Sequence, residues 1–281
     1  MSTLKFSGHE SFHCRTFWLK KGYDFIASGK VFSDESGIDL GVGRNMVDAI
    51  RHWLKSFWIL DEQGTPTDFA NGLFGENGWD PFLEDEASLW LLHFHLLKRD
   101  YASIYPIIFT NLRKIKPDFS KNHLVNLVLE MDEKQNENTL DKDFAAFVRT
   151  YLAQVSGDKE ESFSGLLHEL GLLRESATTV TGKSYHISNT KQDSIPAAIV
   201  LYAIIENEDF ESSVSMNTLF ASGISVGNIF AFSPEGLENK LIEIANLFPD
   251  IVYRNNAGIK ELQFKSEKPK SLDILNQYYG N

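Results

Sequence analysis

The sequence predicts a mainly α-helical protein with small β-hairpins, that is, an α+β fold. Apolar residues recur at helical spacing through much of the first half of the chain. Residues 174–187 and 251–264 each follow a short predicted helix and carry turn sequences typical of hairpins. We expect a winged-helix-like N-terminal domain over residues 1–100, a helical middle over 101–157 and a C-terminal α+β region over 158–281. The last region would hold one or two further helix-plus-hairpin modules, with unrelated α+β packing as the alternative.

Residues 40–60 form the most informative predicted element, an amphipathic helix after a glycine turn. Gly41 and Gly43 bracket the turn, where glycine enters unusual backbone conformations at little cost. A basic-faced helix after such a turn is typical of the second helix of a helix-turn-helix, and residues 58–67 would then form the wing. The alternative is an ordinary core helix whose charged face lies in solvent. The apolar positions are Met46, Val47, Ile50, Trp53, Leu54 and Phe57.

The candidate DNA contacts lie on this helix and on the helix predicted before it. Residues 17–26 are expected to pack under the basic-faced helix and to present two lysines to the DNA backbone. The candidate DNA-binding residues are Lys20, Lys21, Arg44, Asn45, Arg51 and Lys55.

The charge of the chain limits how it can meet DNA. The formal net charge is −12, which argues against a protein that coats DNA non-specifically. Residues 1–55 nevertheless carry 8 basic and 6 acidic side chains, so the remainder carries a net charge of −14. DNA would therefore meet local basic faces, or the acidic C-terminal half would dock a basic partner as an adaptor.

Cysteine content and hydropathy indicate a cytoplasmic protein. Cys14 is the single cysteine, so no internal disulfide can form, which fits a reducing compartment. No apolar run approaches the roughly 18 residues of a membrane span. The first residues also lack the apolar core of a signal peptide.

An acidic group lies at the end of the loop that begins at Gly75 and precedes a strongly apolar helix predicted over residues 87–97. Its members are Asp80, Glu84, Asp85 and Glu86. Clustered carboxylates of this kind can hold Mg²⁺ or Mn²⁺ for phosphodiester chemistry. The alternative is helix capping, because carboxylates in a first turn complement the helix dipole.

His9, Glu10 and His13 match the His-Glu-x-x-His pattern of zinc peptidases. That chemistry requires both histidines on one face of a helix, and Gly8 and the chain start leave little room for one. The alternative is hydrogen bonding within the first domain.

A nuclease-like pattern occurs near the end of the chain. Restriction-type nucleases place an aspartate on one strand and a Glu-x-Lys triplet on the next, and Asp250 and Glu261 have that order. Gln263 stands where the lysine is needed, although a lysine, Lys260, directly precedes Glu261. Neither a P-loop nor a dinucleotide-binding glycine motif is present.

A set of motifs covers the first hundred residues densely and in order. They are residues 6–12 (Phe-Ser-Gly-His-Glu-Ser-Phe), 18–24, 40–47, 50–53, 79–85 and 89–93. In these motifs the chain resembles a bacterial domain-of-unknown-function family encoded beside DNA phosphorothioation genes. The best-described relatives in that family are the SspB proteins of anti-phage systems.

The resemblance implies a cytoplasmic protein that acts on DNA beside a cysteine desulfurase, a sulfurtransferase-like protein and an ATPase. It also implies the hypothesis that the protein nicks one strand as a metal-dependent endonuclease, so that sulfur can enter. In that case Asp80, Glu84 and Asp85 are the candidate catalytic residues, and Asp80 and Asp85 would hold Mg²⁺ or Mn²⁺. The DNA sequence preference and the oligomeric state stay open.

Overall fold

The computed structural model describes residues 4–99, 101–152, 165–179, 182–207 and 210–280. The chain divides into two compact units, Met1–Ser188 and Asn189–Asn281. The predicted boundary at residue 157 lies outside the described residues, and the three-part division stays a prediction. Both units are helical with one small antiparallel sheet each, so the predicted α+β class is confirmed.

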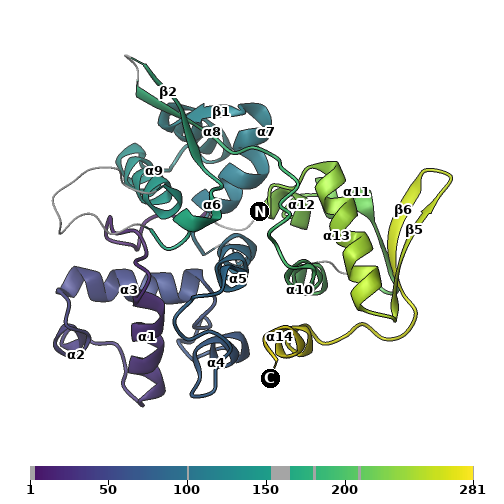
Figure 1. The fold of residues 1–281 in the computed structure, drawn as a ribbon. Helices are drawn as coiled ribbons and strands as arrows, with labels where there is room; N and C mark the ends of the chain where they lie inside the picture. Colours follow the sequence, from purple (N-terminus) through teal and green to yellow (C-terminus); the bar gives the residue numbers. More distant parts are fainter. Residues whose placement is uncertain (1–3, 100, 153–164, 180–181, 208–209, 281) are drawn as a thin grey trace. The chain divides into compact units, whose positions relative to one another are not determined.

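The first unit begins with five helices. They are α1 (Trp18–Ala27), α2 (Ser36–Leu40), α3 (Arg44–Ser56), α4 (Asp68–Phe74) and α5 (Glu86–Lys98). Both α1 and α2 pack against α3 (Figure 1). The approach of α1 is close at Gly22, where a Cβ atom would lie 2.5 Å from Leu54 Cδ1. As the periodicity predicts, Val47, Ile50 and Trp53 on α3 are buried.

The wing is shorter than the sequence predicts. Leu60 and Pro66 form a single antiparallel bridge, with no further ladder among the described residues on either side. Thr67, expected on the return strand, instead caps α4, because its Oγ1 accepts a hydrogen bond from Ala70 N. The winged-helix-like architecture of residues 1–100 therefore stays a prediction.

Helix α5 lies in the interior, as its apolar sequence predicts. Its side chains from Ala87 to Leu97 are all buried. His93 Nδ1 lies 2.8 Å from the Tyr151 hydroxyl, which links α5 to α9 (Glu137–Tyr151). Between them in sequence lie α6 (Ile104–Pro106), a π-helix (Ile107–Leu112), α7 (Arg113–Ile115), β1 (Asp118–Ser120) and α8 (Lys121–Met131).

Part of the polar stretch at residues 131–141, expected to be a linker, is helical. Helix α9 begins at Glu137, because the Asn136 side chain accepts a hydrogen bond from Thr139 N and caps it. The polar residues 137 and 138 lie on its exposed surface, whereas Leu140 is buried. Polarity alone does not separate a loop from the solvent face of a helix.

The predicted hairpin at residues 174–187 is present. Strands β2 (Arg174–Thr179) and β3 (Gly182–His186) pair antiparallel, after a short 3₁₀ helix at His168–Leu170. Strand β1 pairs with the other edge of β3, which gives the order β1-β3-β2. Sequence reasoning missed β1 because three residues are too few to show alternation.

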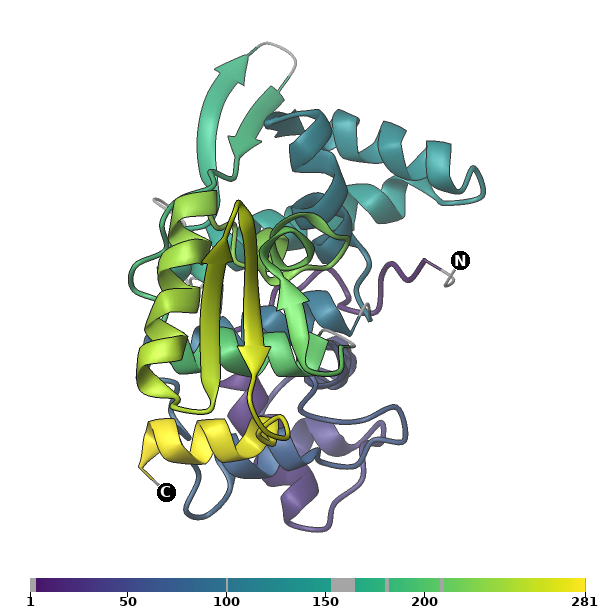
Figure 2. The ribbon, with the colours of Figure 1, turned by 90° about the vertical axis from the view of Figure 1, so that its right-hand side faces the viewer.

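In its described residues, the second unit combines five helices with a sheet of order β4-β6-β5. The strands are β4 (Ser213–Ser215), β5 (Ile251–Asn256) and β6 (Ile259–Phe264), and the turn between β5 and β6 at Ala257 and Gly258 confirms the second predicted hairpin. Figure 2 shows β6 between its two partners, with α13 (Pro234–Leu247) alongside β5. The other helices are α10 (Ala197–Asn207), α11 (Met216–Ala221), α12 (Val226–Ile229) and α14 (Ser271–Tyr279). None of the helices described in either unit has the length and apolar character to cross a membrane.

Candidate functional site

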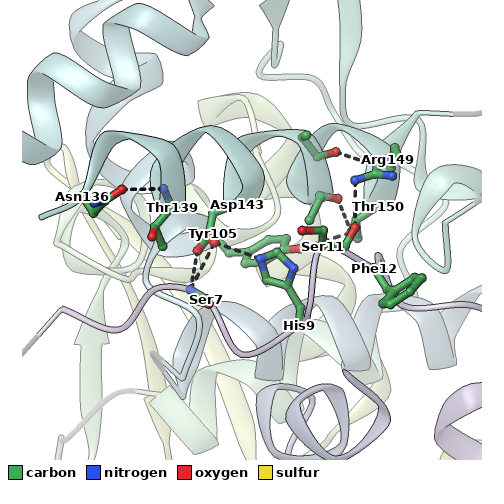
Figure 3. A network of polar contacts seen from close by, with 12 residues as sticks. Ser7, His9, Ser11, Phe12, Tyr105, Asn136, Thr139, Asp143, Arg149 and Thr150 are labelled. Atoms are coloured by element: carbon green, nitrogen blue, oxygen red, sulfur yellow. Dashed lines mark hydrogen bonds and ion pairs between the residues drawn. The ribbon is translucent and has the colours of Figure 1, made fainter. Parts of the chain in front are cut away.

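Residues 5–15, here called the N-terminal strap, are irregular and form no helix. Figure 3 shows the strap passing beside Asp143 and Arg149. Asp143 on α9 is buried and accepts hydrogen bonds from Ser7 N at 3.0 and 3.1 Å. The same carboxylate lies 2.9 Å from His9 Nε2. Trp53 Nε1 donates to the Phe12 carbonyl at 3.1 Å, so the strap is also tied to α3.

The zinc-peptidase interpretation of this strap is wrong. Ser7, Glu10 and Ser11 all have positive φ, and the strap forms no helix, so His9 and His13 do not share a helix face. His9 instead turns to Asp143. The sequence alternative, hydrogen bonding within the first domain, does not describe His9 either, because Asp143 lies in the predicted helical middle.

His52 on α3 lies under the strap. Its ring centroid is 5.9 Å from that of His9, in an edge-to-face arrangement. His52 Nε2 and His9 Nδ1 are buried without a hydrogen-bond partner in the part of the chain that the structure describes. Burial, with a smaller contribution from His9, lowers the pKa of His52 to about 3, so its imidazole is neutral near pH 7.

A cleft of about 670 Å³ opens along the outer side of α3 and is here called the α3 cleft. One wall is α3 itself, a second comes from the strap, and a third follows α1. Its lining residues are Gly8, Glu10, Ile26, Val31, Phe32, Asp48, Arg51, His52, Lys55, Leu60, Gln63, Gly64 and Tyr101.

Two of the predicted DNA-binding residues meet in this cleft. Arg51 is more than half exposed and lies 3.9 Å from Asp48, at the outer limit of an ion pair. Lys55 Nζ donates to the Glu62 carbonyl at 2.9 Å. Both cations thus stand clear of the packed interior, and no carboxylate of the described residues forms a close ion pair with either.

The other predicted DNA-binding residues lie apart from the cleft. Arg44 and Asn45 are exposed at the start of α3, where Arg44 pairs with Asp34 at 3.1 Å. Lys20 and Lys21 line a separate groove on α1, and their ammonium groups bind Asp24 and the Leu40 carbonyl. The structure therefore brings together two of the six predicted DNA-binding residues, Arg51 and Lys55. DNA binding by each of the six stays a prediction.

Sequence reasoning missed a second cationic group beside Lys55. A shallower groove of about 320 Å³ shares Lys55, Leu60 and Tyr101 with the α3 cleft. The Arg99 guanidinium stacks 3.7 Å from the Trp58 ring centroid in this groove. The added cations are Lys5, Lys98 and Arg99. No sequence signal joins them, because they come from the strap and from the end of α5.

The acidic group forms the start of α5. Asp80 is buried, and its carboxylate accepts hydrogen bonds from Glu84 N, Asp85 N and Ser88 Oγ at 2.7–3.0 Å. Asp85 is the N-cap, accepting from Ala87 N at 2.9 Å, and Glu84 is exposed. This geometry is that of helix capping.

Asp80 accepts three hydrogen bonds from the chain itself and Asp85 caps α5, so both carboxylates have a structural role at this helix end. Among the residues that the structure describes, no three or more His, Cys, Asp or Glu side chains are arranged to hold a metal ion. The catalytic and metal-binding roles of Asp80, Glu84 and Asp85 remain predictions without support from their surroundings.

The residues of the nuclease-like pattern near the end of the chain do not come together in the structure either. Glu261 lies opposite Arg254 in the β5–β6 ladder, whereas Asp250 precedes β5 at its other end. Lys260 Nζ binds Glu238 at 2.6 Å. The carboxylates of Asp250 and Glu261 therefore do not form a pair across the hairpin.

Comparisons with known proteins identify the family. A family profile described as "Protein of unknown function (DUF4007)" matches residues 6–279. A solved structure described as "Magnesium ion-bound SspB crystal structure" is 25% identical, with a TM-score of 0.88, over 99% of this chain and 89% of that one. A second, "SspB crystal structure", is 24% identical with a TM-score of 0.85 and the same coverage. No curated protein matches the chain.

The profile spans nearly the whole chain, including the two thirds in which the sequence motifs are sparse. The likeness to the first of the two structures also extends over almost every residue. The predicted resemblance to SspB proteins is thus confirmed, and this protein belongs to the DUF4007 family.

Proposed function

We propose that this protein binds DNA as a component of a bacterial DNA phosphorothioation and anti-phage system. The family and the SspB-like fold support the cellular context. The α3 cleft and the adjoining groove support the contact with DNA, because both are open and lined by aromatic rings and cations. Arg51 and Lys55 balance Glu10 and Asp48 in the cleft, and cations outnumber carboxylates in the groove.

The observation that carries this proposal is the meeting of Arg51 and Lys55 with three further cations. Lys5, Lys98 and Arg99 come from distant parts of the sequence to the same side of the first unit. Asp61 and Glu62 also line this groove, so its four cations exceed its two carboxylates, and in a chain of net charge −12 this local positive excess favours an anionic partner. The phosphates of DNA are such a partner, and the cations would meet them without reading the bases.

The double substitution Arg51→Ala with Lys55→Ala tests the proposal. Each lost phosphate contact should lower the slope of log affinity against log salt concentration by about 1. Fluorescence anisotropy with a labelled DNA duplex at several salt concentrations measures both affinity and slope. Lys121→Ala is the matched control, because Lys121 is an exposed lysine of the same unit that pairs with Asp141. Unchanged binding in the double variant would remove the α3 cleft from the DNA interface.

Strand nicking is a second candidate function. The observation favouring it is that one solved structure of the same fold is described as magnesium ion-bound. Incubation of supercoiled plasmid with the protein and Mg²⁺ or Mn²⁺ would reveal nicking as conversion to the open circle. Conversion that persists in EDTA would exclude metal dependence, and no conversion at all would leave DNA binding alone.

The adaptor hypothesis predicts a different outcome. A protein that docks the cysteine desulfurase, the sulfurtransferase-like protein or the ATPase through its acidic C-terminal half would form a stable complex and bind no DNA by itself. Both units are acidic overall, which supports this alternative. Size-exclusion chromatography of the protein mixed with each partner, beside the DNA titration above, separates the two.

A further inference from the structure

The α3 cleft is lined by rings as well as by cations. Phe32, His52 and Tyr101 all face it, and the His52 and Tyr101 ring centroids are 5.4 Å apart. Arg51 and Lys55 stand on the same helix as His52, one residue before and three residues after it. Aromatic faces beside phosphate-binding cations are what an unstacked nucleotide requires.

His52 offers an unused hydrogen-bonding atom at this position. Its Nε2 is buried and has no partner among the described residues. Gly8 in the strap holds the other side of the ring, since a Cβ atom there would lie 2.5 Å from Nδ1. A buried polar atom left unpaired is costly, so a small movement of the lining that exposed Nε2 to a ligand in the cleft would be favoured.

The size of the cleft selects the kind of DNA that can enter. Its volume, about 670 Å³, lies in the range of pockets that enclose one small molecule. A DNA duplex is too wide for such a space, whereas a single nucleotide turned out of the base stack fits it. Asp48 and Gln63, which also line the cleft, carry hydrogen-bonding groups suited to the edge of a base.

We propose that the α3 cleft binds one nucleotide of a DNA strand that has left the base stack. Arg51 and Lys55 hold its phosphate, and its base lies against the ring of Tyr101, which packs on the buried ring of His52. This inference rests on the proposed DNA binding and adds to it the form of DNA that is bound.

The first test compares two duplexes that differ at one position, one perfectly paired and one with a single unpaired nucleotide. An unpaired nucleotide is already cheap to unstack, so the protein should bind that duplex about tenfold more tightly. Tyr101→Leu should abolish the preference, and Tyr101→Phe, which keeps the ring, should retain it. Thermal melts of the variants show whether each is folded.

Each outcome of this test is informative. Equal affinity of the wild type for both duplexes overturns the nucleotide site and leaves the proposed DNA binding intact. A preference that survives in folded Tyr101→Leu places the unpaired nucleotide elsewhere, and overturns the site as well. Binding to neither duplex contradicts the proposed function itself.

A second test needs no substitution. In protein labelled with ¹⁵N-histidine, deoxyadenosine monophosphate should shift the His52 ring resonances, whereas inorganic phosphate and deoxyadenosine should do so only at concentrations at least about tenfold higher. Equal effects of phosphate and of the nucleotide would reduce the cleft to a simple anion site and overturn the nucleotide proposal. No shift with any of the three would overturn it too.

Discussion

At the scale of single residues, Gly8 fixes the geometry of the candidate site. It adopts φ +92°, in the left-handed half of backbone space that other residues enter only at a cost. It also touches the His52 ring so closely that a methyl group would overlap Nδ1. The glycine in the Phe-Ser-Gly-His-Glu-Ser-Phe motif thus allows the strap to cross α3 and leaves His9 beside Asp143.

Gly8→Ala should destabilise the protein more than Gly29→Ala. Both glycines have positive φ, so alanine costs about 1–2 kcal/mol of backbone strain at either position. A methyl group added at Gly29 would meet nothing within 4 Å, whereas overlap with His52 adds about 1–3 kcal/mol at Gly8. Urea-induced unfolding of the two variants measures the difference, and equal losses would show that His52 moves away freely.

At the scale of an element, the N-terminus of α5 determines how its acidic group should be interpreted. The Asp85 side chain caps the helix, and Asp80 receives hydrogen bonds from the backbone of residues 84 and 85. Aspartate is common both as a helix N-cap and as a metal ligand, so the sequence alone does not separate the two roles. They differ in how they respond to asparagine, which caps as well as aspartate but binds divalent metals less well.

The pair Asp85→Ala and Asp85→Asn separates the two roles. If Asp85 acts only as a cap, alanine should lower the free energy of unfolding by about 1 kcal/mol and asparagine should change it little, with or without Mg²⁺. Urea-induced unfolding at two Mg²⁺ concentrations measures this. Stabilisation of the wild type by Mg²⁺ that disappears in Asp85→Asn would instead support a metal at this helix end.

At the scale of the whole molecule, the proposed DNA interface falls within one of the two units. The six candidate residues and the additional cations all precede residue 100, inside the unit that ends at Ser188. The second unit contributes five helices and its own sheet, and none of the DNA-binding residues proposed above. The two units therefore have separable roles in the proposed function.

A fragment of residues 1–188 should bind the same duplex with an affinity within about threefold of the whole chain, because binding of this kind depends on local phosphate contacts. The fragment of residues 189–281 should not bind. Anisotropy titrations at equal salt test this, with circular dichroism to show that each fragment is folded. Loss of affinity in a folded 1–188 fragment would assign part of the interface to the second unit.

Much of the fold was predictable because the signals are local. The apolar stripe of α3, the all-apolar α5 and the Asn-Asn-Ala-Gly turn between β5 and β6 depend on residues within a few positions of one another. The predictions of secondary structure were wrong where the same residues are compatible with two local structures. The start of α9 has the composition of a linker, and Thr67 has the residue type of a strand as well as of a helix cap.

By itself, the sequence determined the α+β class, the cationic face of α3 and the family, because periodicity, charge and ordered motifs are properties of the linear chain. Only the tertiary structure decided that His9 meets Asp143, 134 residues away, and that Lys5, Lys98 and Arg99 join Lys55. It also decided that Asp80 accepts backbone hydrogen bonds before α5 and that His52 keeps a buried nitrogen unpaired. Such contacts depend on how helices pack, and packing brings together side chains whose spacing along the chain carries no periodic signal.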